Sequence, residues 1–293
     1  MNCYLPPPLK PGDVLKVIAP SGALREFEAF EKGVEIWRSH GYKVEISESI
    51  KGSFGYLAGK DRDRTNQLSE AWNDPQCKGI LCARGGYGSA RILENWTWGN
   101  RHKWLIGFSD ITCLLWSLYN QGKSSVHGAV LTTLASEPDW SIERLFNLVE
   151  GRPLPPLQGI GWGGGIVEGI LLPANLTVAT HLLGTPMQPN LEGVILALED
   201  VTEAPYRIDR LLTQWRLSGV LTKVRGIALG RFSRCEAPPN IPSMTIGEVL
   251  RDRLSDLNIP IVSNLSFGHE GCNAALPVGQ IAQLDAEQGI LTI

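Results

Sequence analysis

Short apolar segments alternate with segments of helical period through the first half of the chain, and this alternation limits the possible folds more than any other feature. The segment VLKVIAP, at 14–20, has the length and composition of a strand. The segment at 25–41 repeats apolar residues at helical spacing and ends at a glycine. Because strands that alternate with helices pair in parallel, the sequence predicts an α/β fold with helices on both faces of the sheet. Further strands are predicted at 42–47, 79–84 and 103–108, and further helices at 60–74 and 111–119.

The composition changes in the middle of the chain, where residues 151–165 read GRPLPPLQGIGWGGG. Proline and glycine dominate there, and the apolar residues follow neither the period of a helix nor that of a strand, so we predict a linker. A chain of 293 residues is about twice as long as a typical domain. We therefore predict an N-terminal domain over 1–150 and a C-terminal domain over 166–293. The C-terminal domain is predicted to be a second α/β unit rich in strands, with strands at 166–172, 193–199, 224–230, 259–265 and 280–293 and helices at 176–184 and 245–257.

Charge and cysteine content exclude several classes of protein. The net charge of −3, with no run of Lys or Arg, argues against a nucleic-acid partner. No basic start followed by an apolar core resembles a signal peptide, and no apolar run approaches the roughly 20 residues of a membrane span. Six cysteines are scattered without a CxxC pair, which is typical of reduced thiols. We predict a cytoplasmic protein with no nucleic-acid or membrane partner.

Four predicted strand ends carry residues of the kind that catalytic sites use. They are the glycine turn at 84–88, Ser109, the pair Glu199 and Asp200, and His269. In open α/β sheets the loops at the carboxyl ends of the strands converge on one crevice. A site built from these loops is therefore expected.

Ser109 lies where the apolar strand at 103–108 gives way to a helix. A sharp strand-to-helix turn with small neighbours exposes a serine hydroxyl, as a nucleophile requires. Gly107 matches the first glycine of the G-x-S-x-G pattern, but Ile111 replaces the second. Ser109 is therefore either a nucleophile or an N-cap residue whose oxygen accepts a helix N–H.

The segment ARGGYGSAR is a glycine-rich turn directly after a strand. It matches neither the G-x-G-x-x-G nor the P-loop pattern, so no nucleotide cofactor is predicted. Adjacent glycines allow backbone N–H groups to approach a ligand closely, as an oxyanion hole requires. A plain tight turn is the other interpretation. With no H-E-x-x-H or paired-cysteine pattern either, no metal is predicted.

A serine nucleophile needs a histidine base, and the chain has five histidines. His40 ends a predicted helix and His102 lies in a polar segment, so both are expected at the surface, and His181 lies within a predicted helix. His127, before Gly128, and His269, in the glycine-flanked segment LSFGHEGCN, remain candidates.

The histidine in turn needs an acid that orients it. Glu199 follows an unbroken apolar strand, and an interior carboxylate costs several kcal/mol unless it is paired or hydrogen-bonded. Alternatively, Glu199 and Asp200 cap a helix and face solvent, whereas Glu203 has the character of a surface acid. The order Ser, Glu, His is also the chain order of the α/β-hydrolases.

These residues stand in segments that together resemble the LD-carboxypeptidases, serine peptidases that act on murein tetrapeptides. The resemblance spans nearly the whole chain. It rests on PGDVLKVIAPSG, ARGGYGSARIL, LIGFSDITCLL, NLTVATHLLGTP, LALEDVTEAPYRIDR and GHEGCNAALPVG, in that order.

By position, the resemblance implies that Ser109 is the nucleophile, Glu199 the acid and His269 the base. It also implies that the backbone N–H groups of Gly86 and Asp110 form the oxyanion hole. The implied fold has a Rossmann- or flavodoxin-like parallel-sheet domain that carries the serine and a strand-rich α/β domain that carries the acid and base. The implied site lies in the interdomain cleft, without a cofactor, in a homodimer.

The reaction implied is hydrolysis of the bond between the L-centre of a diamino acid and a terminal D-alanine, in cytoplasmic recycling of murein. Tyrosine is common in the family at the position of Phe108. The chain departs from the family pattern at Pro173-Ala174, where two glycines are usual, and at HGAV in place of HGP. Both departures lie outside the triad and bear on substrate preference.

Two alternatives remain. The microcin C self-immunity peptidases share the triad but cleave an acyl-sulfamoyl or acyl-phosphoramidate link to a nucleotide. The full GGYG turn and the short loops favour the murein branch. A non-catalytic α/β module could instead use the glycine turn to hold a phosphate or carboxylate.

Overall fold

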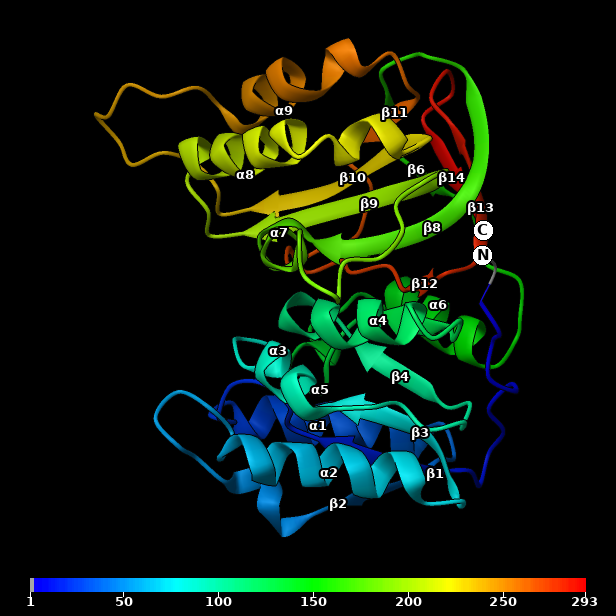
Figure 1. Cartoon of the computed structure of the whole chain (residues 1–293). Helices are drawn as coiled ribbons and strands as arrows, with labels where there is room; N and C mark the ends of the chain where they lie inside the picture. Colours follow the sequence, from blue (N-terminus) through cyan, green and yellow to red (C-terminus); the bar gives the residue numbers. More distant parts are fainter. Residues whose placement is uncertain (1–2) are drawn as a thin grey trace. The chain divides into compact units, whose positions relative to one another are not determined.

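The computed structural model describes residues 3–293, which divide into two compact units (Figure 1). Unit 1 consists of Cys3–Pro153 together with Ala274–Gly279, and unit 2 of Leu154–Asn273 together with Gln280–Ile293. The stretch 151–165, predicted as a linker, contains the short strands β6 (Leu157–Gln158) and β7 (Ile160–Gly161) of the unit 2 sheet.

Unit 1 contains a six-stranded sheet in which every neighbouring pair is parallel except β12 with β5. The strands β2, β1, β3, β4 and β5 follow the order of the flavodoxin-like folds. In that order the chain direction across the sheet reverses between β1 and β3, which is where such folds bind ligands. In sheet order the strands are β12 (Leu276–Val278), β5 (Ser125–His127), β4 (Trp104–Gly107), β3 (Cys77–Cys82), β1 (Val14–Ile18) and β2 (Lys43–Ile46).

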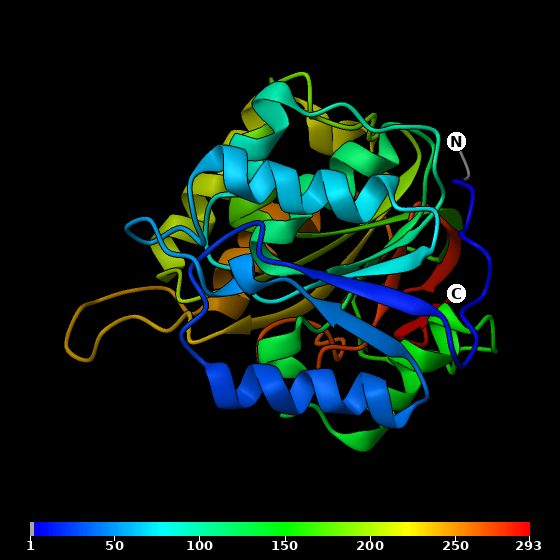
Figure 2. The same ribbon diagram turned by 90° about the horizontal axis from the view of Figure 1, so that it is seen from below.

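Helices cover both faces of this sheet, and Figure 2 shows α1 and α2 on opposite sides of it. Helix α1 (Phe27–Ser39) buries Phe30, Gly33, Val34 and Trp37, the spacing of one helical face. A Cβ on Gly33 would lie 2.1 Å from the Leu131 carbonyl oxygen, so only glycine permits this close approach to α5. The other helices are α2 (Asp61–Asn73), α3 (Ser89–Ile92), α4 (Thr112–Tyr119), α5 (Leu131–Leu134) and α6 (Asp139–Val149), with 3-10 turns η1 (Glu48–Lys51), η2 (Leu93–Asn95) and η3 (Ser109–Ile111).

Unit 2 contains an eight-stranded mixed sheet. Its centre, β8 to β11, is parallel, and antiparallel strands flank this centre on both sides. Helices α8 and α9 pack against each other over the sheet (Figure 1). Apart from β6 and β7, the strands are β8 (Ile166–Asn175), β9 (Val194–Val201), β10 (Gly226–Ser233), β11 (Ile261–Ser263), β13 (Ile281–Asp285) and β14 (Ile290–Thr292). The helices are α7 (Leu176–Leu182), α8 (Pro205–Leu217) and α9 (Ile246–Leu254), with η4 (Val220–Lys223) and η5 (Ser255–Leu257).

The structure confirms the predicted fold class, two α/β units of which the first is a flavodoxin-like parallel sheet and the second is rich in strands. Within residues 3–293, no helix combines the length and the apolar character that a membrane crossing requires.

Candidate active site

Ser109 lies on a sharp turn between β4 and α4. Its backbone φ of +63° is in the left-handed region, which costs a non-glycine residue about 1–2 kcal/mol. A Cβ on Gly107 would lie 2.9 Å from Cγ1 of Ile111, so the side chain that replaces the second motif glycine packs over the first. A side chain at position 107 would therefore collide with Ile111, so the first glycine of the pattern is required.

Ser109 is not an N-cap residue. The N-cap position of η3 is Phe108 and that of α4 is Ile111, and neither makes a side-chain capping bond. Ser109 is instead the first residue of η3 and is partly exposed. Of the two interpretations of this serine, the geometry favours the elbow.

The glycine turn after β3 approaches Ser109 closely. A Cβ on Gly85 would lie 3.0 Å from the Cβ and 3.2 Å from the Oγ of Ser109, so the turn passes directly beside the serine. Gly86 has a φ of +108° and Gly88 of +130°, angles that side-chain-bearing residues rarely adopt. The backbone around Gly86 is therefore close enough to serve a reaction at Ser109.

Glu199 and His269 form a hydrogen-bonded pair in unit 2. The Nδ1 atom of His269 lies 2.6 Å from Oε2 of Glu199, whose side chain is 0% exposed, whereas that of His269 is 15% exposed. A carboxylate has no proton to donate, so Nδ1 carries the hydrogen and the lone pair of the ring lies on Nε2. A histidine in this tautomer can accept a proton through Nε2.

The backbone of the loop after β11 brings His269 to the acid. Gly268 has a φ of +125°, and a Cβ there would lie 3.2 Å from both Cβ and Oε2 of Glu199. The Gly268 N–H donates to Oδ1 of Asn273 at 3.0 Å, and Arg231 N–H donates to the Phe267 carbonyl at 2.8 Å. Glycine is needed at 268 because the loop turns back across the carboxylate.

Glu199 belongs to a larger polar cluster that the sequence did not predict. Asn175, opposite Glu199 in the register of β8 and β9, donates through Nδ2 to Glu199 at 3.2 Å and to Asp200 at 3.1 Å. Asp200 also accepts from the N–H and hydroxyl of Thr177, at 2.9 and 2.7 Å. Both acids are buried, so the interpretation that they face solvent is wrong.

Burial raises the pKa of Asp200 to about 6, and the charge of Glu199 adds to this shift, although the hydrogen bonds from Thr177 oppose it. The sequence singles out Asp200 together with Glu199 but misses Asn175. An asparagine directly before a helix is the signal that could have identified Asn175.

The remaining histidines lie in other surroundings. His127 is completely buried in β5, where its ring packs edge-on against Phe108 with ring centroids 5.9 Å apart. His40, His102 and His181 are exposed. Outside the triad candidates, Glu203 lies two residues before α8 and forms an ion pair at 3.5 Å with Arg207 of that helix. Its side chain is partly exposed, in agreement with a surface acid.

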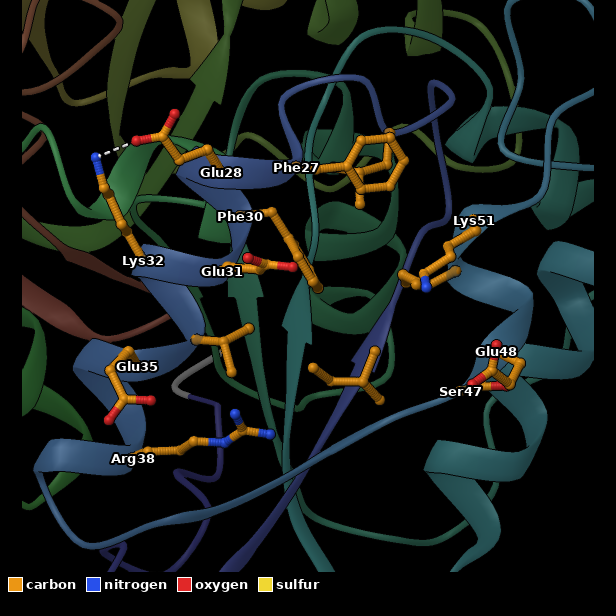
Figure 3. A pocket seen from close by; sticks show the side chains of 14 residues that line it. Phe27, Glu28, Phe30, Glu31, Lys32, Glu35, Arg38, Ser47, Glu48 and Lys51 are labelled. Carbon is orange, nitrogen blue, oxygen red and sulfur yellow. Dashed lines mark hydrogen bonds and ion pairs between the residues drawn. The ribbon is translucent and has the colours of Figure 1, made fainter.

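Unit 1 also contains a pocket on its surface. It is an open groove between α1 and the segment from β2 to η1, and Figure 3 shows Phe27, Phe30 and Lys51 around it. The predicted catalytic and oxyanion-hole residues are absent from its lining. Within the part of the chain that the structure describes, no cluster of three or more His, Cys, Asp or Glu could hold a metal ion.

Both units match known domain families. Residues 15–128 match the LD-carboxypeptidase N-terminal domain, and residues 168–284 match the LD-carboxypeptidase C-terminal domain. The first range contains the elbow and the glycine turn, and the second contains Glu199 and His269.

Individual proteins agree with this match. A Synechocystis sp. protein named "Putative carboxypeptidase" is 59% identical over 293 residues, which cover 99% of this chain and 97% of that protein. The murein tetrapeptide carboxypeptidase of Pseudomonas aeruginosa is 31% identical over 93% of each chain.

Solved structures agree as well. The crystal structure of muramoyltetrapeptide carboxypeptidase from Oxalobacter formigenes has a TM-score of 0.85 at 29% identity, over 95% of this chain and 97% of that one. The microcin C7 self immunity protein MccF has a TM-score of 0.88 over 99% of this chain and 98% of that one. At 21% identity this similarity supports the fold alone.

The matched domains and their relatives exclude a non-catalytic anion-binding module. The chain belongs to the LD-carboxypeptidase family and is a serine-type LD-carboxypeptidase.

Proposed function

We propose that this protein removes the terminal D-alanine of murein tetrapeptides, with Ser109, His269 and Glu199 as its catalytic triad. The observation that carries the proposal is the 2.6 Å hydrogen bond between His269 Nδ1 and a completely buried Glu199. A buried carboxylate hydrogen-bonded to one nitrogen of an imidazole is the arrangement by which acyl-transfer enzymes prepare a histidine base. The relatives that are named for murein peptides support the substrate.

The proposed reaction is acyl transfer in two steps. Nε2 of His269 takes the proton of Ser109 as Oγ attacks the carbonyl carbon of the diamino acid. The negative charge that develops on the carbonyl oxygen is held by the N–H groups of Gly86 and Asp110. Collapse of the tetrahedral intermediate expels D-alanine, whose amine takes the proton from His269. Water, activated by the same histidine, then hydrolyses the ester on Ser109.

The proposed triad combines a nucleophile from unit 1 with an acid and a base from unit 2. A homodimeric state and a role in cytoplasmic murein recycling belong to the same proposal and rest on the family resemblance. Light scattering of the purified protein measures the first, and the muropeptides that accumulate in a deletion strain report the second.

Release of D-alanine tests the substrate. The purified protein should release D-alanine from a murein tetrapeptide and should leave an analogue that ends in L-alanine intact, because only one stereoisomer presents its bond to the serine. A sulfamoyl aminoacyl-adenosine serves as the competing substrate. If the protein cleaves that compound and leaves the tetrapeptide intact, the chain belongs to the microcin C branch and the proposed substrate is wrong.

Replacement of Gly86 by alanine tests the oxyanion hole. A Cβ at Gly86 would lie no closer than 3.6 Å to Gly22, so space is available, but the φ of +108° disfavours any side chain. The backbone should rotate and turn its N–H away, which lowers kcat about tenfold or more and leaves KM nearly unchanged.

Gly12→Ala is the matched control, since Gly12 has a φ of +92° and open space around its Cβ position, far from Ser109 in the sequence. It should cost stability without a loss of kcat. A Gly86→Ala variant that weakens substrate binding but keeps the maximal rate contradicts the assignment.

A further inference from the structure

Three loops of unit 1 meet around one buried carboxylate, that of Asp110. They follow β1, β3 and β4, which are neighbours in the sheet, and β1 and β3 flank the reversal in strand order. Oδ2 of Asp110 accepts from the hydroxyl of Ser21 at 2.5 Å and from the N–H of Ser89 at 2.8 Å. The exposed fractions are 3% for Asp110 and 0% for both serines. We call these three residues the Asp110 network.

Ser89 binds Asp110 at a second point. Its hydroxyl donates to the backbone carbonyl of Asp110 at 2.5 Å, in addition to the bond from its N–H to the side chain. Side chain and carbonyl of Asp110 are thus both tied to the residue that ends the glycine turn. The N–H of Asp110 belongs to the preceding peptide plane, so these bonds restrain it indirectly, by holding the side chain and the carbonyl on the same Cα.

The Gly86 N–H is fixed through the preceding carbonyl. The N–H of Gly22 donates to the carbonyl oxygen of Gly85 at 3.2 Å. The peptide between Gly85 and Gly86 is planar and trans, so its C=O and N–H point in opposite directions. A bond that holds the oxygen on the side of Gly22 therefore turns the N–H of Gly86 to the other side.

Ser21 and Gly22 are adjacent, so one loop holds both proposed donors. The Ser21 hydroxyl reaches the Asp110 side chain, and the Gly22 N–H reaches the Gly85 carbonyl. The loop is itself anchored, because the Ser21 carbonyl accepts from the N–H of Ala58 at 3.0 Å.

We propose that Ser21 and Ser89, acting through Asp110, are positioning residues that set the oxyanion hole before substrate binds. The inference rests on the proposed function, in which Gly86 and Asp110 supply the two donors. Oxyanion donors accelerate a reaction because they are already aimed at the developing charge and need no reorganisation. Ser21 and Ser89 supply this order through Asp110, whose N–H is one of the two donors.

Ser21→Ala and Ser89→Ala test the inference, since each removes one hydroxyl and keeps the backbone. The kcat of each variant should fall about tenfold or more, which is less than the fall expected when an oxyanion donor is removed altogether. KM should change little. A peptide aldehyde forms a tetrahedral adduct with Ser109 whose negative charge lies in the same oxyanion hole. Its affinity for each variant should therefore fall by a similar factor.

Ser141→Ala is the matched control. Ser141 is 2% exposed and, like Ser21, donates to a carboxylate, that of Glu137 at 2.8 Å. Its loss should lower the melting temperature about as much as the loss of Ser21, with kcat unchanged. An equal loss of kcat in Ser141→Ala, or a Ser21→Ala variant that raises KM alone, overturns the positioning role.

Asp110 variants add a rescue test. Asp110→Asn keeps an oxygen that can accept from both Ser21 and Ser89, so it should be several-fold faster than Asp110→Ala. Asp110→Ala leaves both donors buried without an acceptor and should lose kcat as the serine variants do, or lose stability as well. An asparagine variant as slow as the alanine variant contradicts a role through hydrogen bonding.

The rate of Ser109 phosphonylation by a fluorophosphonate separates this inference from the proposed substrate. The probe places negative charge on a phosphoryl oxygen in the same hole and needs no murein peptide. If the wild-type protein reacts with the probe but releases no D-alanine, the substrate proposal fails and the positioning role is still measured. If Ser21→Ala and Ser89→Ala react as fast as the wild type, the positioning role fails.

Discussion

Ser109→Ala should lower kcat about 10⁴-fold or more and leave the protein folded. Without the hydroxyl, the enzyme retains substrate binding and oxyanion stabilisation but has no atom to form the acyl-enzyme. The rate of D-alanine release at saturating tetrapeptide measures this loss. Circular dichroism and the melting temperature report the fold.

Ser109→Gly separates the chemistry from the backbone strain at this position. The φ of +63° costs any side-chain-bearing residue about 1–2 kcal/mol, a cost that glycine does not have. The glycine variant should therefore be as inactive as the alanine variant but melt at a higher temperature than it. A residual rate above about a tenth of the wild type in either variant requires a different nucleophile.

The fold was largely predictable because its central strands are long and apolar. Predicted segments such as 14–20 and 79–84 correspond to β1 and β3, and the helix predicted at 60–74 corresponds to α2. The strands that were missed are short. β5 and β12 have three residues each, and β12 reaches its partner from the far end of the chain. A period of two cannot be recognised over three residues, and pairing over such a separation leaves no local signal.

The pairing of Glu199 with His269 illustrates how much of the site the sequence could indicate. The position of Glu199 after an apolar strand suggested an interior acid, but solvent exposure remained open. The two acids can be buried because Asn175, at the end of the adjacent strand, and Thr177, in the helix that follows it, donate hydrogen bonds to them. These hydrogen bonds depend on the register of β8 with β9, which cannot be predicted from the sequence.

The Asp110 network was not predictable for a related reason. Ser21 and Ser89 are 89 and 21 residues away from Asp110 in the chain. Small polar residues in glycine-rich loops are common, and their sequence context alone favours turns. Only the parallel order of β1, β3 and β4 brings the three loops to the same edge of the sheet.

Glu199→Gln should lower kcat about 10³- to 10⁴-fold with little change in fold, because it reverses the tautomer of the base. The amide of Asn175 donates to Oε1 of Glu199, so a glutamine at 199 places its oxygen there and its NH₂ toward His269. An NH₂ group facing Nδ1 makes that nitrogen an acceptor, and the ring proton moves to Nε2. A histidine protonated at Nε2 cannot take the serine proton.

His269→Ala should be at least as slow, because it removes the base itself. Glu203→Gln is the control for the acid and should change kcat little, since Glu203 pairs with Arg207 at the surface. His127→Ala is the control for the base. It removes a completely buried ring that packs against Phe108, so it should lower the melting temperature more than it lowers kcat.

The four rates, measured below the melting temperature of each variant, decide between the two histidines and the two acids. In the proposed triad Glu199 acts only through His269, so the double variant Glu199→Gln with His269→Ala should be no slower than His269→Ala alone. Independent roles would instead multiply the two losses. If His127→Ala is inactive and His269→Ala is active, the base is His127 in β5. Glu199, which is proposed to act through His269, would then have no role in the mechanism either.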